Sequence, residues 1–293
     1  MRLRPLFAIG AGLAMVGSMH PGFADAAGAW TRTTTTITAS ASSSTYDSLV
    51  TFTAQVGGTV APVGGSVTFT DESNGRATVE TICAQGNEAY FAKVDVSSET
   101  EVKGVIETVI ARWGRIDILF NNAGVLLVKS IEDMTGDEWD RVMAVNVKAA
   151  FLATKYVAPH MRRGGGGAIL TTGSIASFTG QLGTPAYSAS KGAIALLTKS
   201  LALDLGRDHI RVNCICPGIT DTPMLREHLG HGAEGEAHIR ARLSRVPTGA
   251  ILSPEDIARA ALYLVSDDSI GITGVLHVVD GGLLAASEYD VPL

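Results

Sequence analysis

The chain has 293 residues, of which 46% are hydrophobic and 18% charged, and its formal net charge is −6. This length and composition predict a globular protein with one large core and an appendage. The acidic balance gives no basic surface for nucleic acid. After the first 26 residues, no apolar run reaches the roughly 18 residues that a membrane span needs. We therefore expect neither a nucleic-acid partner nor a transmembrane helix after removal of the leader.

Residues 1–26 have the pattern of a secretory signal peptide. Arg2 and Arg4 precede an apolar run, and the small residues around Ala24 and Ala26 predict cleavage after Ala26. Gly10-Ala11-Gly12 lies inside the apolar run, so we assign these glycines to the leader and not to a ligand-binding loop. The leader indicates export.

Residues 27–75 predict a short β-rich segment or a Ser/Thr-rich linker. Thr33–Thr38, Val50–Val56 and Ser66–Thr70 alternate apolar and hydroxyl side chains between Ser, Gly and Pro residues. This sequence pattern resembles part of a bacterial immunoglobulin-like repeat from exported surface proteins. The segment is shorter than the roughly 100 residues of a complete sandwich, so the linker interpretation stays open beside the partial module.

Residues 88–284 alternate between short apolar runs and longer helical patterns, which predicts an α/β fold with a doubly wound parallel sheet. The expected strands are Ala89–Val94, Ile116–Phe120, Ala168–Thr172, Ile210–Ile215 and Gly274–Val279. The expected helices are Ser98–Arg112, Asp137–Met161, Ala186–Gly206 and Pro254–Ser266. Ser253 is the predicted N-cap of the last helix, because a proline and two acidic residues follow it.

Polar and glycine-containing turns follow four of these strands. Asp95 ends the first, Asn121-Asn122-Ala123-Gly124 follows the second, Ser174 follows the third and Pro217-Gly218 follows the fourth. Ligands of such sheets bind beyond the carboxyl ends of the strands. We therefore expect one crevice to collect these residues.

Tyr187 and Lys191 are four residues apart in an alanine-rich helical pattern, so both side chains project from one helix face. A phenol with an ordinary pKa of about 10 exchanges protons poorly at neutral pH unless a nearby positive charge stabilises its phenolate. Lys191 supplies such a charge, and the pair predicts an acid/base unit. Taken alone, a packed ring beside a solvated ammonium is the ordinary alternative.

The ordered motifs of residues 76–293 resemble the short-chain dehydrogenase/reductase family, whose sheet is Rossmann-like. The resemblance extends from about Arg76 to Ala285. The motifs that carry it are, in chain order, Val94–Ser97, Arg115–Leu119, Asn121–Gly124, Val145–Val147, Ser174, Tyr187 with Lys191, Pro217–Thr222 and Val279–Gly282. Each motif alone is weakly specific, whereas their order is strongly specific.

The resemblance implies an NAD(P)-dependent oxidoreductase that interconverts a secondary alcohol and a ketone. Tyr187 would be the general acid/base, and Lys191 would lower its pKa and bind the nicotinamide ribose. Ser174 would stabilise the reacting oxygen, and Asn146 would hold a water that links Lys191 to solvent. The resemblance also implies a homo-oligomer, either tetramer or dimer, packed through the helices around Asn146 and Tyr187.

Hydride chemistry requires a cofactor, because no amino-acid side chain is a competent hydride donor. The resemblance implies NAD or NADP, held by Asp71, Asp95, Val96, Asn122, Ala123, Gly124, Tyr187, Lys191, Pro217, Gly218, Ile219 and Thr222. Asp71 follows the run Ser66–Thr70, which we also interpret as the second strand of a dinucleotide fold. A carboxylate at that place binds the ribose hydroxyls and favours NAD over NADP.

The sequence departs from the family at its front. A dinucleotide fold of this type begins with a strand, a glycine-rich turn and a helix, and no helix-length segment follows Gly57-Gly58 or Gly64-Gly65. We interpret the region of residues 60–80 as a join between two reading frames, made by recombination or by an error of sequence assembly. We also expect Val50–Val56 to fill the gap that the missing strand leaves in the sheet.

Two further functions stay open on this sequence. The first is a catalytically compromised remnant that lacks a competent pyrophosphate site, and the second is an exported binding or adhesion module. Localisation is open for the same reason, because the leader indicates export whereas the family and the cysteine usage indicate the cytoplasm. Cys214 and Cys216 alternate in a buried type of strand, so we expect no disulfide framework.

The segment of residues 220–250 resembles the mobile substrate loop of the family. We expect a solvated loop here and no metal site, because His228, His231 and His238 lack ligand spacing. The apolar side chains of Val125–Val128 and Phe178 point to a non-ionic substrate.

Overall fold

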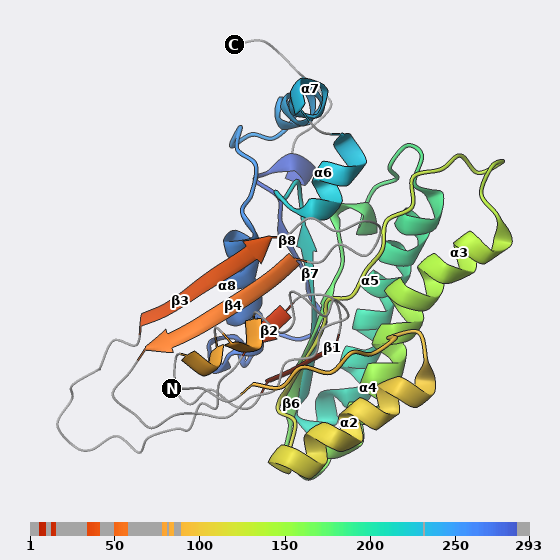
Figure 1. Ribbon diagram of the computed structural model, residues 1–293. Helices are drawn as coiled ribbons and strands as arrows, with labels where there is room; N and C mark the ends of the chain where they lie inside the picture. The colour runs from red at the N-terminus through yellow and green to blue at the C-terminus, as the bar shows by residue number, and fades with distance from the viewer. Residues whose placement is uncertain are drawn as a thin grey trace.

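The computed structural model describes residues 6–9, 13–15, 34–41, 50–57, 78–80, 82–84, 89–230 and 232–285 (Figure 1). Asp71, the predicted run Ser66–Thr70 and most of the predicted leader lie outside these residues. Residues 78–80 and 82–84 are helical. The described residues form two sheets, with helices packed on them.

The larger sheet has five parallel strands in the order β1-β5-β6-β7-β8. Their bounds are Leu6–Ile9, Ile118–Asn121, Gly167–Thr172, Ile210–Pro217 and Leu276–Val279, respectively. Four of the five expected strands are therefore present, and the predicted α/β fold with a parallel sheet is confirmed. The central strands β5, β6 and β7 are almost wholly buried, as strands with helices on both faces should be.

The first position of the sheet differs from the expectation. It is occupied by β1, whose residue Leu6 pairs with Ile118 and whose Ile9 pairs with Asn121. The expected insertion of Val50–Val56 into the sheet is wrong. That run forms β4 (Val50–Gly57) in a second, three-stranded sheet, where it pairs antiparallel with β3 (Thr34–Ala41) and parallel with β2 (Leu13–Met15). Segments close in sequence pair readily with one another, which favours the β3–β4 pair over insertion.

The expected strand Ala89–Val94 is also wrong, because only Lys93 in this run forms a bridge. Its side chains nevertheless enter the core: Ala89 and Val94 are buried. The apolar pattern thus predicted burial correctly and pairing incorrectly.

All four predicted helical regions form helices, and two further helices occur within residues 223–243. The α-helices are α2 (Glu99–Trp113), α3 (Gly136–Met143), α4 (Ala149–Arg163), α5 (Pro185–Leu205), α6 (Pro223–Leu229), α7 (Gly232–Leu243) and α8 (Pro254–Val265). One π-helical turn, η1 (Ala144–Lys148), joins α3 to α4 without a break. Short 3₁₀ turns are η2 (Ile175–Ser177), η3 (Gly206–Asp208), η4 (Asp267–Ser269) and η5 (Leu283–Ala285).

Capping residues set where these helices begin. Ser98 caps α2, and Thr135 with Glu138 forms a capping box at the start of α3. The expected N-cap Ser253 is confirmed, since its hydroxyl accepts from the Asp256 N–H, and the Asp256 carboxylate accepts from the Ser253 N–H. The caps fix the position of the helices along the chain, and burial fixes their rotation.

Helices cover both faces of the larger sheet (Figure 1). On one face, α2, α4 and α5 pack over β5, β6 and β7, and their apolar stripes merge into the main core. The stripe of α2 has the spacing of one helix face and consists of Val102, Val105, Ile106 and Val109. On the other face, α8 packs against β6, β7 and β8 and lies beside β3 and β4.

The carboxyl end of β7 meets the segment after β8 at very short range. The Gly218 N–H donates to Val279 O at 2.8 Å, and a side-chain carbon at Gly218 would lie 2.6 Å from the Asp280 Cα. Only a glycine allows this approach, because the opposing atom belongs to the backbone and cannot move aside. Gly218 was expected to contact a cofactor, and the structure gives it this packing role as well.

We predict that Gly218→Ala lowers the free energy of unfolding by about 1–3 kcal/mol, the usual cost of forcing an extra methyl group into a packed site. Gly104 on the exposed side of α2 has open space around it, so Gly104→Ala should raise stability by roughly 0.5–1 kcal/mol through better helix propensity. Urea midpoints of the two variants would measure both effects. Equal and small shifts would contradict the packing role of Gly218.

Candidate active site

A cavity of about 720 Å³ opens at the carboxyl ends of β5, β6 and β7. Its wall includes Asn122 and Gly124 after β5, Ser174 after β6, and Pro217 with Gly218 at the end of β7. The structure therefore brings together residues that are up to 96 positions apart (Asn122 to Gly218), as the strand ends predicted. Tyr187 and Lys191 of α5 complete this wall.

Tyr187 and Lys191 lie one turn apart on α5. Pro185 occupies the first position of this helix, where its fixed backbone angle helps the helix to begin. The Lys191 Nζ lies 5.6 Å from the centroid of the Tyr187 ring, and the Lys191 side chain is only 3% exposed. The two groups thus share one water-poor corner of the cavity.

Lys191 is held by the end of strand β6. Its Nζ donates a hydrogen bond to Thr172 O at 2.7 Å. Burial lowers the pKa of Lys191 from 10.5 to about 8, because removal from water disfavours the ammonium form. No carboxylate lines the described wall of the cavity to oppose this shift. Lys191 is therefore a cation that titrates close to physiological pH.

Burial also acts on Tyr187, whose pKa it raises above the usual 10, while the Ser174 hydroxyl partly opposes the shift. The resemblance implied the opposite direction, with Lys191 lowering this pKa. In the structure the Lys191 ammonium is directed to Thr172 O, and desolvation of the phenol is the largest influence on its pKa. Tyr187 is consequently protonated at neutral pH.

Ser174 lies at the turn between β6 and α5, where it caps the 3₁₀ turn η2. Its Oγ accepts from the Ala176 N–H at 3.1 Å, and its own N–H donates to Ser177 Oγ. Ser177 Oγ in turn donates to Lys191 O at 2.9 Å. This chain of hydrogen bonds ties Ser174 to α5, so the hydroxyl and the phenol keep a fixed relation.

Asn146 occupies the middle of the π-helical turn η1 and is buried. Its Oδ1 accepts from the Val125 N–H at 2.8 Å, and its Nδ2 donates to Val125 O at 3.0 Å and to Ser190 Oγ at 2.9 Å. One side chain thus fastens the turn after β5 to α5. Such π turns in α-helices frequently mark functional sites, but hydrophobic spacing did not predict this one.

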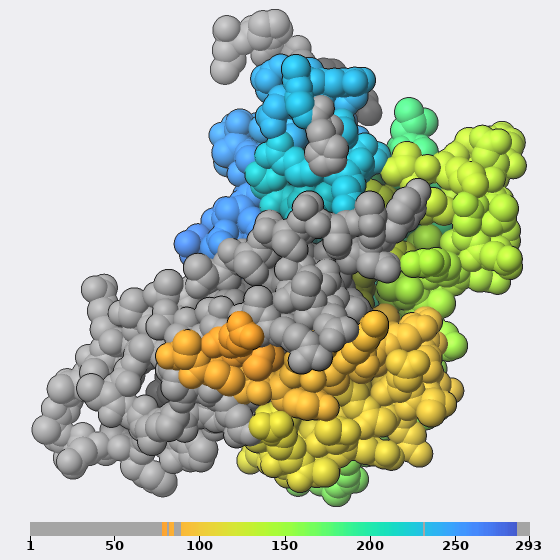
Figure 2. Space-filling model, viewed as in Figure 1, coloured from red at the N-terminus to blue at the C-terminus, as the bar shows by residue number. Residues whose placement is uncertain are grey.

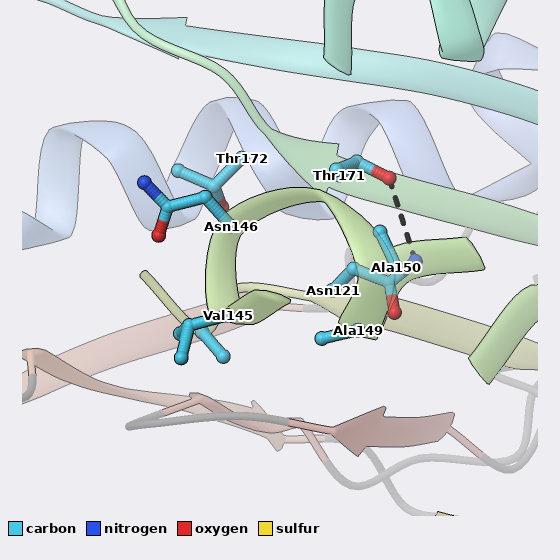
Figure 3. Close-up of a pocket in the computed structure, with 8 residues that line it drawn as sticks. Asn121, Val145, Asn146, Ala149, Ala150, Thr171 and Thr172 are labelled. Atoms are coloured by element: carbon cyan, nitrogen blue, oxygen red, sulfur yellow. Dashed lines mark hydrogen bonds between the residues drawn. The ribbon is translucent and has the colours of Figure 1, made fainter. Parts of the chain in front are cut away.

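Gly124 lies where these groups converge. A side-chain carbon at this position would be 3.5 Å from Asn146 Oδ1 and 3.6 Å from Lys191 Nζ. Beside them a small cavity of about 10 Å³ is lined by Asn146, Thr172, Asn121, Thr171, Ala123, Val145, Ala149 and Ala150. Figure 3 shows the Asn146 and Thr172 side chains near one another, and the hydrogen bond from Asn121 to Thr171 apart from them.

Most residues expected to contact a cofactor lie on the wall of the large cavity, namely Asn122, Gly124, Tyr187, Lys191, Pro217, Gly218, Ile219 and Thr222. Three do not. Ala123 lines the small cavity, and Val96 is buried in the main core. Asp95 is exposed and its carboxylate accepts from the Ser97 N–H and hydroxyl, so in this structure it supports a turn.

The large cavity suits the half of a dinucleotide that reacts. Its volume falls within the range of small-molecule sites, and donors such as Lys191, Thr222 and Asn122 converge on it from separate elements. Asp71, which was expected at the adenosine ribose, lies outside the described residues.

The segment of residues 220–250 differs from the expected solvated loop. It contains α6 and α7, and Thr222 caps α6 by accepting from the Leu225 N–H. The half-buried His228 of α6 lines the cavity, as do Arg242 of α7 and Arg245 just beyond it. Sequence reasoning missed both arginines, because their cavity contact depends on how α7 folds back over the site.

Two thiols pack against Gly173, which lines the large cavity. Cys214 and Cys216 are buried on β7 with their sulfur atoms 3.7 Å apart, and a side-chain carbon at Gly173 would lie 2.7 Å from the first and 2.8 Å from the second. All three cysteines of the chain are free thiols. Across the described residues, His, Cys, Asp and Glu side chains form no group of three or more that could hold a metal ion.

Comparison with known proteins agrees with this arrangement. Residues 54–284 match the family model described as enoyl-(acyl carrier protein) reductase. The match begins upstream of Arg76, within the segment that the sequence pattern assigns to the linker. None of the helices in the described part of the chain is long and apolar enough to cross a membrane.

Two curated relatives illustrate the similarity in sequence. A cyclopentanol dehydrogenase of Comamonas testosteroni is 38% identical over 224 residues, which cover 76% of this chain and 88% of that protein. A 3-oxoacyl-(acyl-carrier-protein) reductase of Thermotoga maritima is 37% identical over 191 residues, which cover 65% of this chain and 75% of that protein.

Solved structures show the same likeness. A putative short-chain dehydrogenase/reductase from Burkholderia xenovorans superposes with a TM-score of 0.73 at 30% identity, covering 77% of this chain and 86% of that one. An NAD⁺-bound xylitol dehydrogenase superposes with a TM-score of 0.71 at 30% identity, covering 75% and 88%. The fold and the site define a Rossmann-like oxidoreductase. The chain belongs to the short-chain dehydrogenase/reductase family.

We predict that the buried charge of Lys191 makes stability depend on pH. Between pH 8 and 10.5 the unfolded chain holds a proton that folded Lys191 has released, so the folded state gains stability as the pH rises. Relative to Lys191→Met, wild-type stability should therefore increase by about 2 kcal/mol from pH 7 to pH 9.5. Urea unfolding at the two pH values would measure this difference.

Lys199 provides the control, because it is exposed on the same helix α5. The difference between wild type and Lys199→Met should stay constant over the same pH range. A constant difference for Lys191→Met as well would show that Lys191 keeps an ordinary pKa.

Proposed function

We propose that this protein interconverts a secondary alcohol and a ketone with NAD or NADP, using Tyr187 as general acid/base with Ser174 and Lys191. The observation that carries the proposal is the convergence of these three side chains on one cavity at the carboxyl ends of the parallel strands. The named activities of the relatives, a cyclopentanol dehydrogenase among them, support alcohol and ketone chemistry in general.

Tyr187 serves as the proton donor when a ketone is reduced. The raised pKa keeps a proton on its phenol oxygen at neutral pH, and this proton passes to the carbonyl oxygen as that oxygen becomes an alkoxide. In the direction of alcohol oxidation, the same oxygen receives the proton back. The raised pKa thus favours the reduction direction at neutral pH.

Ser174 orients the reacting oxygen beside Tyr187. One lone pair of its hydroxyl is occupied by the Ala176 N–H, which leaves the hydroxyl hydrogen free to donate into the cavity. Donation to the oxygen stabilises negative charge as it develops in the transition state. The hydrogen-bonded link from Ser177 to α5 keeps this donor in place.

Lys191 stabilises the phenolate that remains after Tyr187 has given up its proton. Its ammonium lies against Thr172 O at 2.7 Å and carries a charge below a pH of about 8. The small cavity beside Asn146 has about the minimum volume for one water and several polar neighbours. This supports a role of Asn146 in linking Lys191 to solvent through a water.

The nicotinamide dinucleotide supplies the hydride acceptor or donor when bound. We assign its reactive half to the cavity wall made by Asn122, Gly124, Ile219 and Thr222 together with Tyr187 and Lys191. The superposition on an NAD⁺-bound relative supports a dinucleotide in this family. Asp71 is the residue that we propose favours NAD over NADP.

We also propose a homo-oligomer packed through α4 and α5. Phe151 on α4 and Leu196 and Leu203 on α5 are large apolar side chains that are exposed on the single chain, with Leu203 at 83%. Burial of such side chains in a subunit interface is favourable.

The first test is a calorimetric titration of the full chain with NADH and then NADPH, after circular dichroism has confirmed folding. We expect saturable binding, with the tighter dissociation constant for NADH. A folded chain that binds neither dinucleotide would refute the proposed function and favour the catalytically compromised remnant.

We predict that Tyr187→Phe lowers kcat for ketone reduction by about 10²–10⁴-fold, the usual contribution of a positioned acid or base. The dissociation constant for NADH should not change, because the ring remains in place. Tyr263→Phe on the surface of α8 is the matched control and should retain full activity. Full activity of Tyr187→Phe would exclude Tyr187 as the proton donor.

A further inference from the structure

One wall of the large cavity is basic. It is formed by His228 of α6, Arg242 of α7 and Arg245 just after α7. No Asp or Glu is among the described residues that line this cavity. Figure 2 shows the cyan segment that contains α6 and α7 at the end of the molecule opposite the yellow helix α2. The positive wall therefore belongs to the covering helices and not to the sheet.

Arg242 is the key member of this wall. Its Nη2 lies 3.1 Å from His228 Nε2, and its Nη1 is buried without any hydrogen-bond acceptor within the described part of the chain. Burial alone lowers its pKa, which means that no carboxylate close by opposes the shift. The side chain is half-buried and carries a full charge with unused donors.

Nearby carboxylates are engaged elsewhere. Asp221 accepts two hydrogen bonds from Arg226, at 2.7 and 2.8 Å, and Glu236 forms a further ion pair with the same guanidinium. Arg226 lies on α6, as does His228, whereas Arg242 lies on α7. Arg226 is thus paired with carboxylates. Arg242, which lines the cavity, has no carboxylate partner among the residues that the structure describes.

An unpaired, partly buried guanidinium is unfavourable unless something compensates for it. A buried N–H without an acceptor costs about 1–3 kcal/mol, and such exceptions in folded proteins call for an explanation. The planar fork of arginine matches a carboxylate or phosphate through two parallel hydrogen bonds. Its contact with His228 Nε2 holds the fork in position until such an anion arrives.

We propose that the substrate carries an anionic group, a carboxylate or a phosphate, which Arg242 binds while His228 positions the guanidinium and the carbonyl faces Tyr187. This assignment rests on the proposed function, and it replaces the non-ionic substrate indicated by Val125–Val128 and Phe178. The cofactor also carries phosphates, so the same chemistry has a second source that the experiment must separate.

The test compares keto acids with their methyl esters. We would titrate the full chain, with and without saturating NADH, with 4-oxopentanoate, 6-oxoheptanoate and the two methyl esters. For the wild type we expect at least one of the acids to bind about tenfold or more tightly than its ester. Arg242→Gln should remove this preference, and Arg242→Lys should retain part of it because the charge remains.

Arg240 gives a matched control. It is exposed on the same helix and is not part of the cavity wall, so Arg240→Gln removes the same charge and should leave the preference intact. Circular dichroism and melting temperature would establish that both variants fold. Equal affinity of acid and ester in the wild type, or an unchanged preference in Arg242→Gln, would overturn the proposal.

The dissociation constant of NADH separates the two sources of the anion. We expect it to be unchanged in Arg242→Gln. A weaker NADH complex together with an unchanged acid preference would assign Arg242 to a cofactor phosphate and overturn the substrate assignment.

Binding does not require turnover, so the two proposals fail separately. An acid preference that Arg242→Gln abolishes, in a protein that reduces no ketone, would support the anion site and refute the oxidoreductase function. Ketone reduction without an acid preference would support the oxidoreductase function and refute the anion site.

Discussion

The site depends on the buried ammonium of Lys191 against the carbonyl of Thr172. This hydrogen bond joins the end of a central strand to the N-terminal part of α5, so it fixes the part of the helix that also carries Tyr187. The charge sits where water is largely excluded, which lowers its pKa to about 8. The same burial that makes the lysine costly for stability makes its charge effective on a neighbouring oxygen.

Several hydrogen bonds around this pair hold the fold together and also position the proposed reactive groups. Asn146 fastens the turn after β5 to Ser190 on α5, one position from Lys191. Ser177 joins the turn after β6 to the Lys191 carbonyl. Two turns and one helix are thus held together by side chains, and the cavity keeps its shape because each of these turns is anchored twice.

The cavity has two walls of different character. The wall built by the sheet and α5 carries the acid/base groups, and the wall built by α6 and α7 carries unpaired positive charge. In our proposals, the first wall performs the proton transfer and the second wall selects the substrate. A change in α6 and α7 can therefore alter what is bound without disturbing Tyr187 or Lys191.

Hydrophobic pattern and capping predicted much of this fold. The strands β5 to β8 and the helices α2, α5 and α8 were predictable, because period and caps are local properties of the sequence. The π turn at Asn146 was not, since no side-chain cap marks it within the continuous helical pattern. The cavity contact of Arg242 was also hidden, because it arises from the packing of α7.

Two apolar runs illustrate what the hydrophobic pattern leaves unspecified. An apolar run such as Leu6–Ile9 suits a leader peptide and a buried strand equally, so composition cannot distinguish them. In the run Ala89–Val94, Ala89 and Val94 are buried although the run does not pair as a strand. Burial can be predicted from the hydrophobic pattern of a sequence, whereas the strand with which a segment pairs cannot.

The position of β1 bears on the predicted export of the chain. The strand β1 (Leu6–Ile9), which pairs with β5, lies within residues 1–26, the segment whose sequence pattern predicts a cleavable leader. Cleavage would leave the backbone groups of β5 without their neighbour on that side. Removal of the predicted leader would therefore also remove β1, so a cleaved chain could not form this five-stranded sheet.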